Sequence, residues 1–309
     1  KLNVWTSSQG PFIKRAKLAT TLGLPFSNVR VLKAYVGGAY GGKVDLFSHE
    51  FCTSLLSIKA RRPVKIVCTR EEVFESARHG QPIYVELKTG VKKDGTLVAQ
   101  QVKVINNSGA YRGSGVVVIF LCWGFVMLCY RIPNLKYEGY SVYTNNPVRA
   151  PQRGHGAPNL RFAVESQMDM IAEELGIDPV EIRLKNARQK GDVLPNEDSV
   201  RNCGLVECIE RVAETTHLKE KYGINKSLAK TRIRKGIGMG VSSYFSGSLI
   251  YPNASAAVVK LNDDGTVSLL TGALDIGQGA ETILSQIVAE EPGVLLDGRR
   301  VVEADTKRT

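Results

Sequence analysis

Three glycine-bearing turns, each placed directly before a predicted helix, most constrain how this chain folds. They are VGGAYGGKV at 36–44, RAPQRGHGAPN at 149–159 and DIGQGAE at 275–281. Glycine lets a backbone approach a ligand closely, and the free N–H groups of a helix N-terminus favour an anion. Taken one at a time, each turn is better explained as an ordinary tight turn. Together, the three turns indicate a large polyanionic ligand held from several sides.

The first of these turns has the outline of a phosphate-binding P-loop. Gly37, Gly42 and Lys43 have the spacing of that motif, which next requires Ser or Thr as a ligand of magnesium. Val44 stands at this position instead. The sequence therefore excludes a nucleotide-hydrolysing P-loop at this turn.

The pattern of apolar residues predicts a mixture of helices and strands, of fold class α+β. Apolar residues at three- and four-residue spacing predict helices, and Asp-Gly pairs between alternating segments predict hairpins. Asp178 and Pro179 are the residue types expected at a helix start. We expect helices at 11–25, 45–60, 159–175, 178–186, 205–216 and 280–291, and strands or hairpins at 29–36, 63–69, 83–105, 236–245, 255–272 and from 301.

A change in composition divides the predicted fold. Residues 217–235 are polar and basic, and a β pattern starts again after them. We therefore expect a first domain over 1–220, a linker over 221–235, and the beginning of a second domain over 236–309. The second domain is expected to be incomplete.

The longest apolar run, VVVIFLCWGFVML at 116–128, is too short to span a bilayer as a helix. It is interpreted as a buried strand or core segment. No signal peptide is visible at the start of the sequence. Six cysteines without a Cys-x-x-Cys pair indicate buried thiols rather than a zinc or iron–sulfur site. These features favour a reducing, cytoplasmic location and no membrane partner.

The formal net charge of +11 allows several interpretations. It is consistent with a solvated basic surface, with an anionic ligand or with an acidic partner. The basic residues are scattered and are not interleaved with aromatic residues, as they are in a nucleic-acid recognition module. A nucleic-acid-binding function rests on charge alone, and we expect no nucleic-acid partner.

Four motifs in a fixed order give the chain a resemblance to a known family. RGHGAPN at 153–159 precedes a helical segment at 162–187, SSQ stands at 7–9, GGAYGGK at 37–43 and GQG at 277–279. Over essentially all of its residues, the chain resembles the molybdenum-cofactor-binding subunit of the xanthine oxidase family. These molybdenum hydroxylases include aldehyde oxidoreductases and hydroxybenzoyl-CoA reductases. The resemblance implies two mixed α/β subdomains, without the N-terminal and C-terminal parts of the family's subunit.

The resemblance also implies cofactors and partners. Molybdenum would be held by molybdopterin, in the cytosine dinucleotide form of bacterial relatives, and not directly by protein side chains. The reaction would be a two-electron oxidation or reduction at carbon of a small molecule, with water as the oxygen source. Electrons would pass to 2Fe-2S and FAD cofactors on partner subunits, since this chain has no cysteine cluster. A further partner would be a chain or segment carrying the remaining cofactor-binding region.

Roles for single residues follow from the resemblance. Gln9 matches the glutamine that hydrogen-bonds an oxo ligand, Tyr40 the aromatic residue beside the metal, and Arg153 an arginine whose planar fork binds phosphate or oxo groups. Gln278 lies in a turn whose backbone donors would meet a pyrophosphate. The expected cofactor-binding residues are Gln9, Gly38, Tyr40, Gly41, Gly42, Arg153, Gly154, Gly277, Gln278 and Gly279, and the expected substrate-pocket residues are Val44 and His155.

Several positions depart from the family pattern. Tyr40 and His155 stand where the family commonly has Phe, and Val44 stands where purine-oxidising members have Glu. The Tyr40 hydroxyl either bonds a ligand or reaches a backbone group, and His155 either bonds the substrate or is structural. The apolar segment 116–128 also lacks the arginine of purine-oxidising members. These differences argue against xanthine and favour an aromatic, acyl-thioester or aldehyde substrate.

The family's catalytic base is a glutamate in a Gly-Glu pair, which acts on the attacking water. The sequence holds no Gly-Glu pair, and Glu290 and Glu291, at a predicted helix end, are poor substitutes. We therefore assign no catalytic residue to this chain and expect no turnover by the chain alone. The missing glutamate leaves a second interpretation open, a non-catalytic module that binds a cofactor or a partner.

Overall fold

The computed structural model describes residues 1–221, 236–244, 255–294 and 299–309. The chain forms two compact units, and each is described by itself. Unit 1 comprises Lys1–Gly80, Pro147–Arg153 and Gly247–Thr309, and unit 2 comprises Gln81–Asn146 and Gly154–Ser246. Both units mix helices and strands, which confirms the predicted α+β class.

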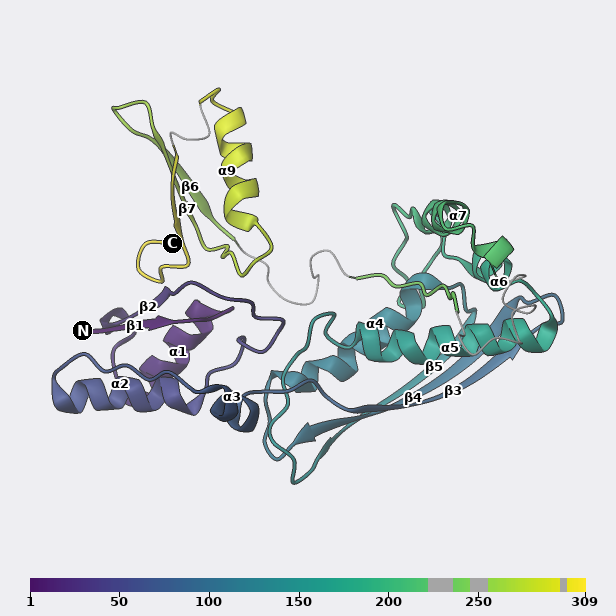
Figure 1. Cartoon of the computed structure of the whole chain (residues 1–309), viewed down its shortest axis with the longest axis horizontal. Helices are drawn as coiled ribbons and strands as arrows, with labels where there is room; N and C mark the ends of the chain where they lie inside the picture. Colours follow the sequence, from purple (N-terminus) through teal and green to yellow (C-terminus); the bar gives the residue numbers. More distant parts are fainter. Residues whose placement is uncertain (222–235, 245–254, 295–298) are drawn as a thin grey trace. The chain divides into compact units, whose positions relative to one another are not determined.

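The first part of unit 1 is a parallel strand pair joined by a helix. Its elements are β1 (Leu2–Thr6), α1 (Pro11–Leu22), the 3-10 turn η1 (Phe26–Asn28), β2 (Val29–Lys33), α2 (Ser48–Ala60) and α3 (Arg70–Ser76). Strands β1 and β2 pair with Leu2 opposite Val29, and α1 makes the crossover that a parallel pair requires (Figure 1). The core of this part is formed by Leu2, Leu18, Ala19, Val29, Val31 and Leu46.

The second part of unit 1 is a three-stranded sheet with one helix. Its elements are β6 (Ala257–Leu261), β7 (Val267–Thr271), α9 (Ala280–Glu290) and β8 (Arg299–Glu303). Strands β6 and β7 form the predicted hairpin, in which Gly265 has the positive φ, 78°, that the turn needs, and β8 pairs in parallel with β7. The ion pairs Arg30–Asp305 and Lys33–Glu303 join this part to β2.

Unit 2 is a three-stranded sheet with helices packed against it. Its elements are β3 (Ile83–Val91), β4 (Leu97–Gly109), the 3-10 turn η2 (Ser114–Val116), α4 (Val117–Cys129), β5 (Asn134–Tyr143), α5 (Ala157–Leu175), α6 (Pro179–Asn186) and α7 (Leu205–Thr215). The strand order is β3-β4-β5, with an antiparallel hairpin at Asp94-Gly95 as predicted, and a parallel pair of β4 with β5. Helices α4 and α5 contact this sheet and each other (Figure 1).

A buried ion pair fixes α5 to α6 in unit 2. Arg183 Nε donates to the Glu165 carboxylate at 2.8 Å, and the Tyr130 hydroxyl donates to the same carboxylate at 2.8 Å. The Arg183 side chain is fully buried. Burial, together with the Glu165 charge, raises the pKa of Tyr130, so this hydroxyl stays a neutral donor.

The apolar run at 116–128 is helix α4, so the predicted buried strand is wrong and the predicted core segment is right. Side chains all around the helix are apolar, and such a pattern does not distinguish a buried helix from a buried strand. Its buried residues include Cys122, Phe125 and Cys129, which pack in the core of unit 2. In the part of the chain that the structure describes, no helix has the length and apolar character needed to cross a bilayer.

Two other predicted strands are wrong. Residues 63–69 belong to no strand ladder, and neither do residues 236–244. A strand needs a partner, and neither segment has one in the described residues. Residue 245 and the predicted linker, apart from Lys221, lie outside the described residues, and the predicted domain limits of 1–220 and 236–309 stay a prediction.

Candidate functional site

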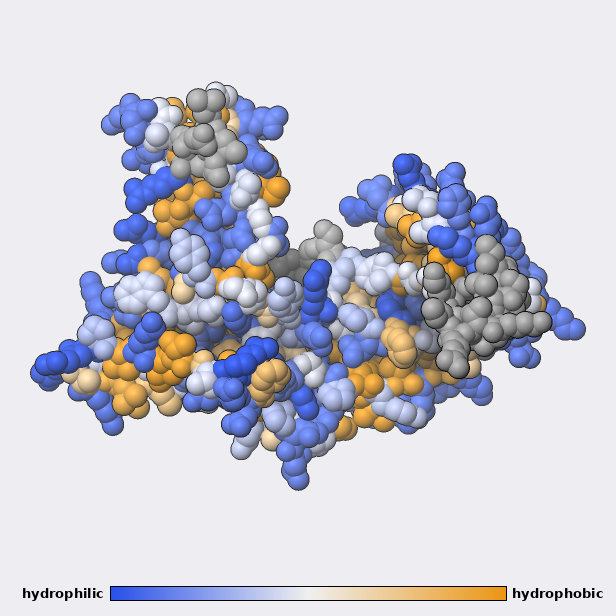
Figure 2. Space-filling model, in the orientation of Figure 1, coloured by the Kyte–Doolittle hydropathy of each residue, from blue (hydrophilic) through white to orange (hydrophobic). Residues whose placement is uncertain are grey.

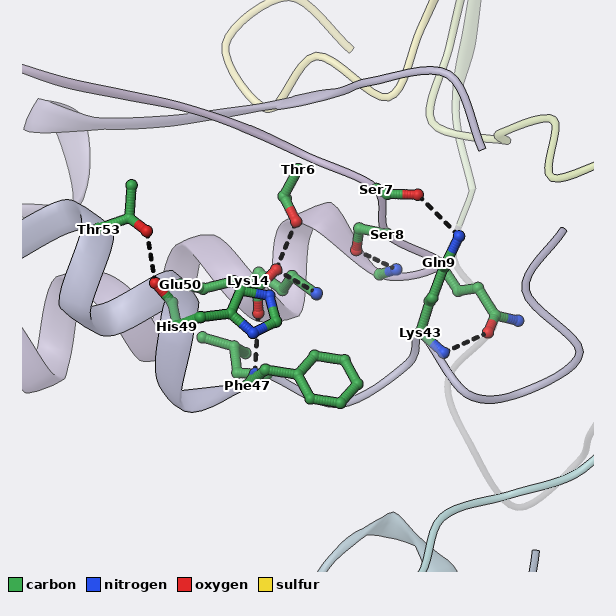
Figure 3. Close-up of polar contacts among 12 residues, drawn as sticks. Thr6, Ser7, Ser8, Gln9, Lys14, Lys43, Phe47, His49, Glu50 and Thr53 are labelled. Carbon is green, nitrogen blue, oxygen red and sulfur yellow. Dashed lines mark hydrogen bonds and ion pairs between the residues drawn. The ribbon is translucent and has the colours of Figure 1, made fainter. Parts of the chain in front are cut away.

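Two loops meet at one edge of the β1–β2 sheet. Residues 7–9 follow β1, and residues 36–44, called the glycine loop, follow β2, so parallel pairing starts both loops at the same edge. The Gln9 N–H donates to the Lys43 carbonyl at 3.0 Å. The Lys43 N–H donates to Gln9 Oε1, also at 3.0 Å (Figure 3). Lys43 Nζ donates to Ser7 Oγ at 3.0 Å. The structure thus brings the sequence-predicted Gln9 into direct contact with the glycine loop.

This contact fixes the orientation of the Gln9 amide. Because the amide oxygen accepts the Lys43 N–H, the amide nitrogen keeps two N–H donors, and neither meets an acceptor within the described residues. The Lys43 ammonium has a hydroxyl partner and no carboxylate partner in the same set of residues. Burial and the nearby Lys14 cation lower the pKa of Lys43. Gln9 and Lys43 therefore form a cluster of donors that suits an anionic, oxygen-bearing group.

A buried ion pair stands next to the two loops. Lys14 Nζ lies 2.5 Å from Glu50 Oε1, and the two side chains are 1% and 5% exposed. The Thr6 hydroxyl donates to the same carboxylate, and the Phe47 N–H donates to Glu50 Oε2 at 2.9 Å (Figure 3). Glu50 therefore joins the end of β1, helix α1 and the start of α2, from which both loops are positioned.

The glycine loop packs against residues 150–153. The Arg153 N–H donates to the Tyr40 carbonyl at 2.9 Å. Tyr40 has a φ of 51°, its side chain is 66% exposed, and its hydroxyl donates to no backbone group within the described residues. A Cβ atom on Gly41, which has a φ of 95°, would lie 2.3 Å from the Pro151 carbonyl oxygen. Only glycine allows this close approach.

Replacing Gly41 by alanine is expected to destabilise unit 1 by about 2 kcal/mol, because the new Cβ strains a left-handed backbone and strikes a carbonyl oxygen. Gly37→Ala is the matched control, because a Cβ there meets no atom within 4 Å and its φ is not in the left-handed region. Hydrogen-exchange rates of the β1 and β2 amides measure the loss of stability in both variants. Equal exchange rates in the two variants would show that the loop adapts to the clash.

The turn before α5 is divided between the two units. Arg153, in unit 1, has an exposed side chain and makes no ion pair within the described residues. In unit 2, Gly154, His155 and Gly156 have φ values of 89°, 42° and 97°. A positive φ costs a histidine conformational free energy, so packing must hold His155 in this position.

His155 has a buried ring nitrogen in this turn. Its Nε2 atom is buried and makes no hydrogen bond within the described residues. Burial lowers the pKa of His155, so the ring is neutral at neutral pH. A buried polar atom without a partner is costly, which makes this nitrogen a candidate for contact with a bound ligand.

The Gly-Gln-Gly turn satisfies its own polar groups. Gln278 Oε1 accepts the Ile276 N–H at 2.8 Å, and its Nε2 donates to the Leu274 carbonyl at 2.9 Å. The Asp275 carboxylate accepts the N–H groups of Gly277 and Glu281 at 2.8 and 3.1 Å. In this structure the backbone donors expected to meet a pyrophosphate therefore meet a carboxylate of the same turn.

Asp275 anchors this turn to β2 and β8. Its carbonyl accepts from Lys33 Nζ at 2.9 Å, and its N–H donates to Glu303 at 2.7 Å. The N–H groups of Gly277 and Glu281 lower the pKa of Asp275. Because the folded pKa is lowered, its stabilising contribution is present above about 3.9, the ordinary value, and is lost as the pH falls through the lowered value.

Asp275→Ala is expected to speed hydrogen exchange of the Gly277 and Glu281 amides about fivefold at pH 7, the equivalent of a lost cap of about 1 kcal/mol. The difference from the unchanged chain should shrink as the pH falls through the lowered pKa of Asp275, where the carboxyl becomes protonated. Asp263→Ala, at an exposed aspartate between β6 and β7, is the control. A pH-independent difference would contradict the role of the charge.

Sequence reasoning missed three polar residues of these turns. The side chains of Ser7 and Lys43 join the two loops, and Asp275 fills the Gly-Gln-Gly turn. Lys43 and Asp275 stand inside the motifs themselves, which is the signal that points to them. The partner of Lys43 is distant in the sequence, and the partners of Asp275 depend on the conformation of the turn. Residue spacing alone predicts neither set of contacts.

The donors around Gln9 fit an anionic cofactor better than a directly bound metal ion. No group of three or more His, Cys, Asp or Glu side chains in the described residues is placed to hold a metal. The Gln9 amide donors, which have no acceptor within the described residues, and the Lys43 ammonium suit oxygen acceptors. The Gly-Gln-Gly turn would have to release Asp275 before its backbone could bind an anion.

Comparisons with known proteins match the segments that contain these loops. Profiles described as a molybdopterin cofactor-binding domain match residues 1–187 and 211–309. The chain is 36% identical over 304 residues to a putative xanthine dehydrogenase molybdenum-binding subunit from Escherichia coli strain K12, covering 98% of this chain and 40% of that protein. It is 39% identical over 214 residues to the nicotinate dehydrogenase large molybdopterin subunit of Eubacterium barkeri, covering 69% of this chain and 50% of that protein.

A solved structure shares the fold. The aldehyde oxidoreductase from Desulfovibrio gigas superimposes with a TM-score of 0.91 at 27% identity, and the match covers 99% of this chain and 34% of that one. The chain thus spans half or less of the length of each of these proteins. The similarity extends over nearly the whole chain and over a part of each relative.

Proposed function

This chain belongs to the molybdopterin cofactor-binding proteins of the xanthine dehydrogenase and aldehyde oxidoreductase family. We propose that it is the molybdopterin-binding portion of a molybdenum hydroxylase that acts on an aromatic, acyl-thioester or aldehyde substrate. The observation that carries the proposal is the contact between Gln9 and Lys43. It presents two amide donors that no acceptor of the described residues engages, near the Lys43 cation, at the edge where both family loops begin.

The proposed cofactor is molybdopterin in its cytosine dinucleotide form. When bound, it supplies a two-electron exchange at carbon, with water as the oxygen source. Gln9 would donate hydrogen bonds to its oxygen atoms, and the glycine loop would approach it through backbone at Gly38, Gly41 and Gly42. The other proposed contacts are Tyr40, Arg153, Gly154, Gly277, Gln278 and Gly279.

The proposed substrate class rests on Val44, His155 and Tyr40. Val44 supplies no charge to bind a purine, and the neutral His155 ring keeps a buried nitrogen that has no partner among the described residues. Two of the relatives are named for an aldehyde and for nicotinate, which supports an aldehyde or a heteroaromatic ring over xanthine. The relative named as a xanthine dehydrogenase supports the opposite choice, so substrate assays must include xanthine.

The proposed partners follow from what the described residues lack. Electrons would leave through 2Fe-2S and FAD subunits, because no cysteine cluster is present in the described residues. A chain or segment with the remaining cofactor-binding region would bring the glutamate base, since the sequence has no Gly-Glu pair. We therefore expect the isolated chain to be inactive.

One observation favours a second candidate function, a non-catalytic module. Asp275 and Gln278 use the polar groups of the Gly-Gln-Gly turn internally, as a turn without a ligand would. A complex purified from the native source decides between the two. The first function predicts turnover of benzaldehyde, nicotinate or an aromatic acyl-thioester in excess of xanthine. Turnover of xanthine at the highest rate would overturn the substrate class, and a molybdenum-free complex without turnover would support the module.

A further inference from the structure

The segment 63–69 has the sequence of a β-strand and no strand beside it. Val64, Ile66, Val67 and Thr69 are β-branched residues, which are enriched in strands. The segment runs without a turn or a bend between α2 and α3 (Figure 1). Within the described residues, no hydrogen bond engages the backbone of residues 64–68. Its N–H and C=O groups are therefore available to another strand.

Contacts with α2 hold the segment in place. The Arg62 carbonyl accepts from Ser57 Oγ at 2.8 Å near the end of α2, and Cys68 Sγ lies 4.0 Å from His49 Nδ1 in its first turn. The segment thus runs back along the helix. Val64 and Cys68 are half-buried, on the side of the segment where Cys68 meets His49. Alternation along a strand places Ile66, which is 41% exposed, on that side as well.

The segment carries exposed apolar residues and has positive charge at its start. Val67, on the side opposite Cys68, is 72% exposed, and α2 carries the exposed apolar residues Leu55, Leu56 and Ile58. Figure 2 shows apolar side chains at the surface over this region. The exposed cations at its start, which make no ion pair within the described residues, are Lys59, Arg61, Arg62 and Lys65.

We propose that residues 63–69 are a docking strand, which pairs with a β-strand of the remaining cofactor-binding region carried on the longer relatives. The xanthine dehydrogenase relative has about three-fifths of its length outside the match, which leaves room in that relative for such a region. The docking strand adds backbone hydrogen bonds and buries Val67, and the cations at its start select a strand flanked by acidic residues. The identity of this partner rests on the proposed function.

A second copy of this chain is the less suitable occupant. Antiparallel self-pairing centred on Ile66 would place Arg62 opposite Arg70 of the other copy, twice in each dimer. Like charges directly opposite each other destabilise a strand pair. The net charge of +11 adds to this repulsion.

Hydrogen exchange of the amides at 64–68 tests the docking strand. The rates are measured in the isolated chain and in the complex purified from the native source, whose partner chain is identified by sequence. We expect exchange in the complex to be slower by at least about 100-fold, as for amides in a stable ladder. Equal rates, or a folded chain that purifies without any partner, would overturn the proposal. Protection that rises with the concentration of the isolated chain would assign the strand to a second copy instead.

A pair of variants separates docking from general effects. Val67→Asp is expected to reduce the amount of partner retained on the chain at least tenfold, because it puts a carboxylate on the docking strand. Val193→Asp is the matched control, since Val193 is 63% exposed and lies in unit 2. Equal retention would contradict the proposal. Molybdenum content is read separately, so a complex that docks without molybdenum counts against the proposed function and not against the docking strand.

Discussion

Glu50→Ala is expected to lower the free energy of unfolding of unit 1 by about 3–5 kcal/mol. The change leaves the Lys14 cation buried at 1% exposure without its carboxylate, and it removes the acceptor of the Thr6 hydroxyl and the Phe47 N–H. The cost is that of an uncompensated buried charge rather than the net value of the pair. Urea unfolding, followed by hydrogen exchange of the β1 and α1 amides, measures this loss of unfolding free energy.

Two controls test this explanation. The double change Lys14→Met and Glu50→Leu should recover most of the loss, because it removes both charges from the interior. Glu86→Ala, in an exposed pair with Lys103, should cost no more than about 1 kcal/mol. A loss below about 1 kcal/mol for Glu50→Ala would show that water reaches Lys14.

Gln9→Leu is expected to lower kcat of the native complex about 100-fold, with molybdenum content unchanged. Leucine keeps much of the side-chain volume and removes the amide donors that the Lys43 contact orients. Steady-state assays on the preferred substrate, together with metal analysis of the same preparation, separate lost catalysis from lost cofactor. The expected pattern is a fall in kcat with little change in KM, because under the proposed function the donors would act on the cofactor and not on the substrate.

A change at an exposed glutamine controls for this variant. Gln101→Leu, on strand β4 in unit 2, should leave kcat unchanged. If Gln9→Leu retains kcat within a factor of about three, Gln9 does not act on the cofactor. If molybdenum is lost together with activity, the role of Gln9 is to retain the cofactor and not to change its reactivity.

Elements whose ends are marked by local residue signals, such as helix caps and Asp-Gly turns, were predicted correctly from the sequence. Asp178 accepts the Val180 N–H at the start of α6, and the Asp-Gly pairs at 94–95 and 264–265 form the turns of both hairpins. Helix α4 and segment 63–69 were misassigned because their states depend on tertiary partners. An apolar run fits either a buried strand or a buried helix, and a strand pattern does not show whether a partner strand is present.

The candidate site was predictable only in part. The motifs brought Gln9 and the glycine loop to attention, but their contact joins residues 34 positions apart and depends on the parallel pairing of β1 and β2. The internal bonding of Gln278 with Ile276 and Leu274 follows from the conformation of the turn, which residue types alone do not fix. Site residues on different elements therefore need the fold before their geometry is defined.

Elemental analysis of the natively purified chain by plasma mass spectrometry tests the central claim most directly. The account predicts near-stoichiometric molybdenum, together with co-purifying chains that carry iron and flavin. A folded chain that purifies with its full set of partners and contains no molybdenum would contradict it, and would leave the two loops around Gln9 and Lys43 as part of a binding module.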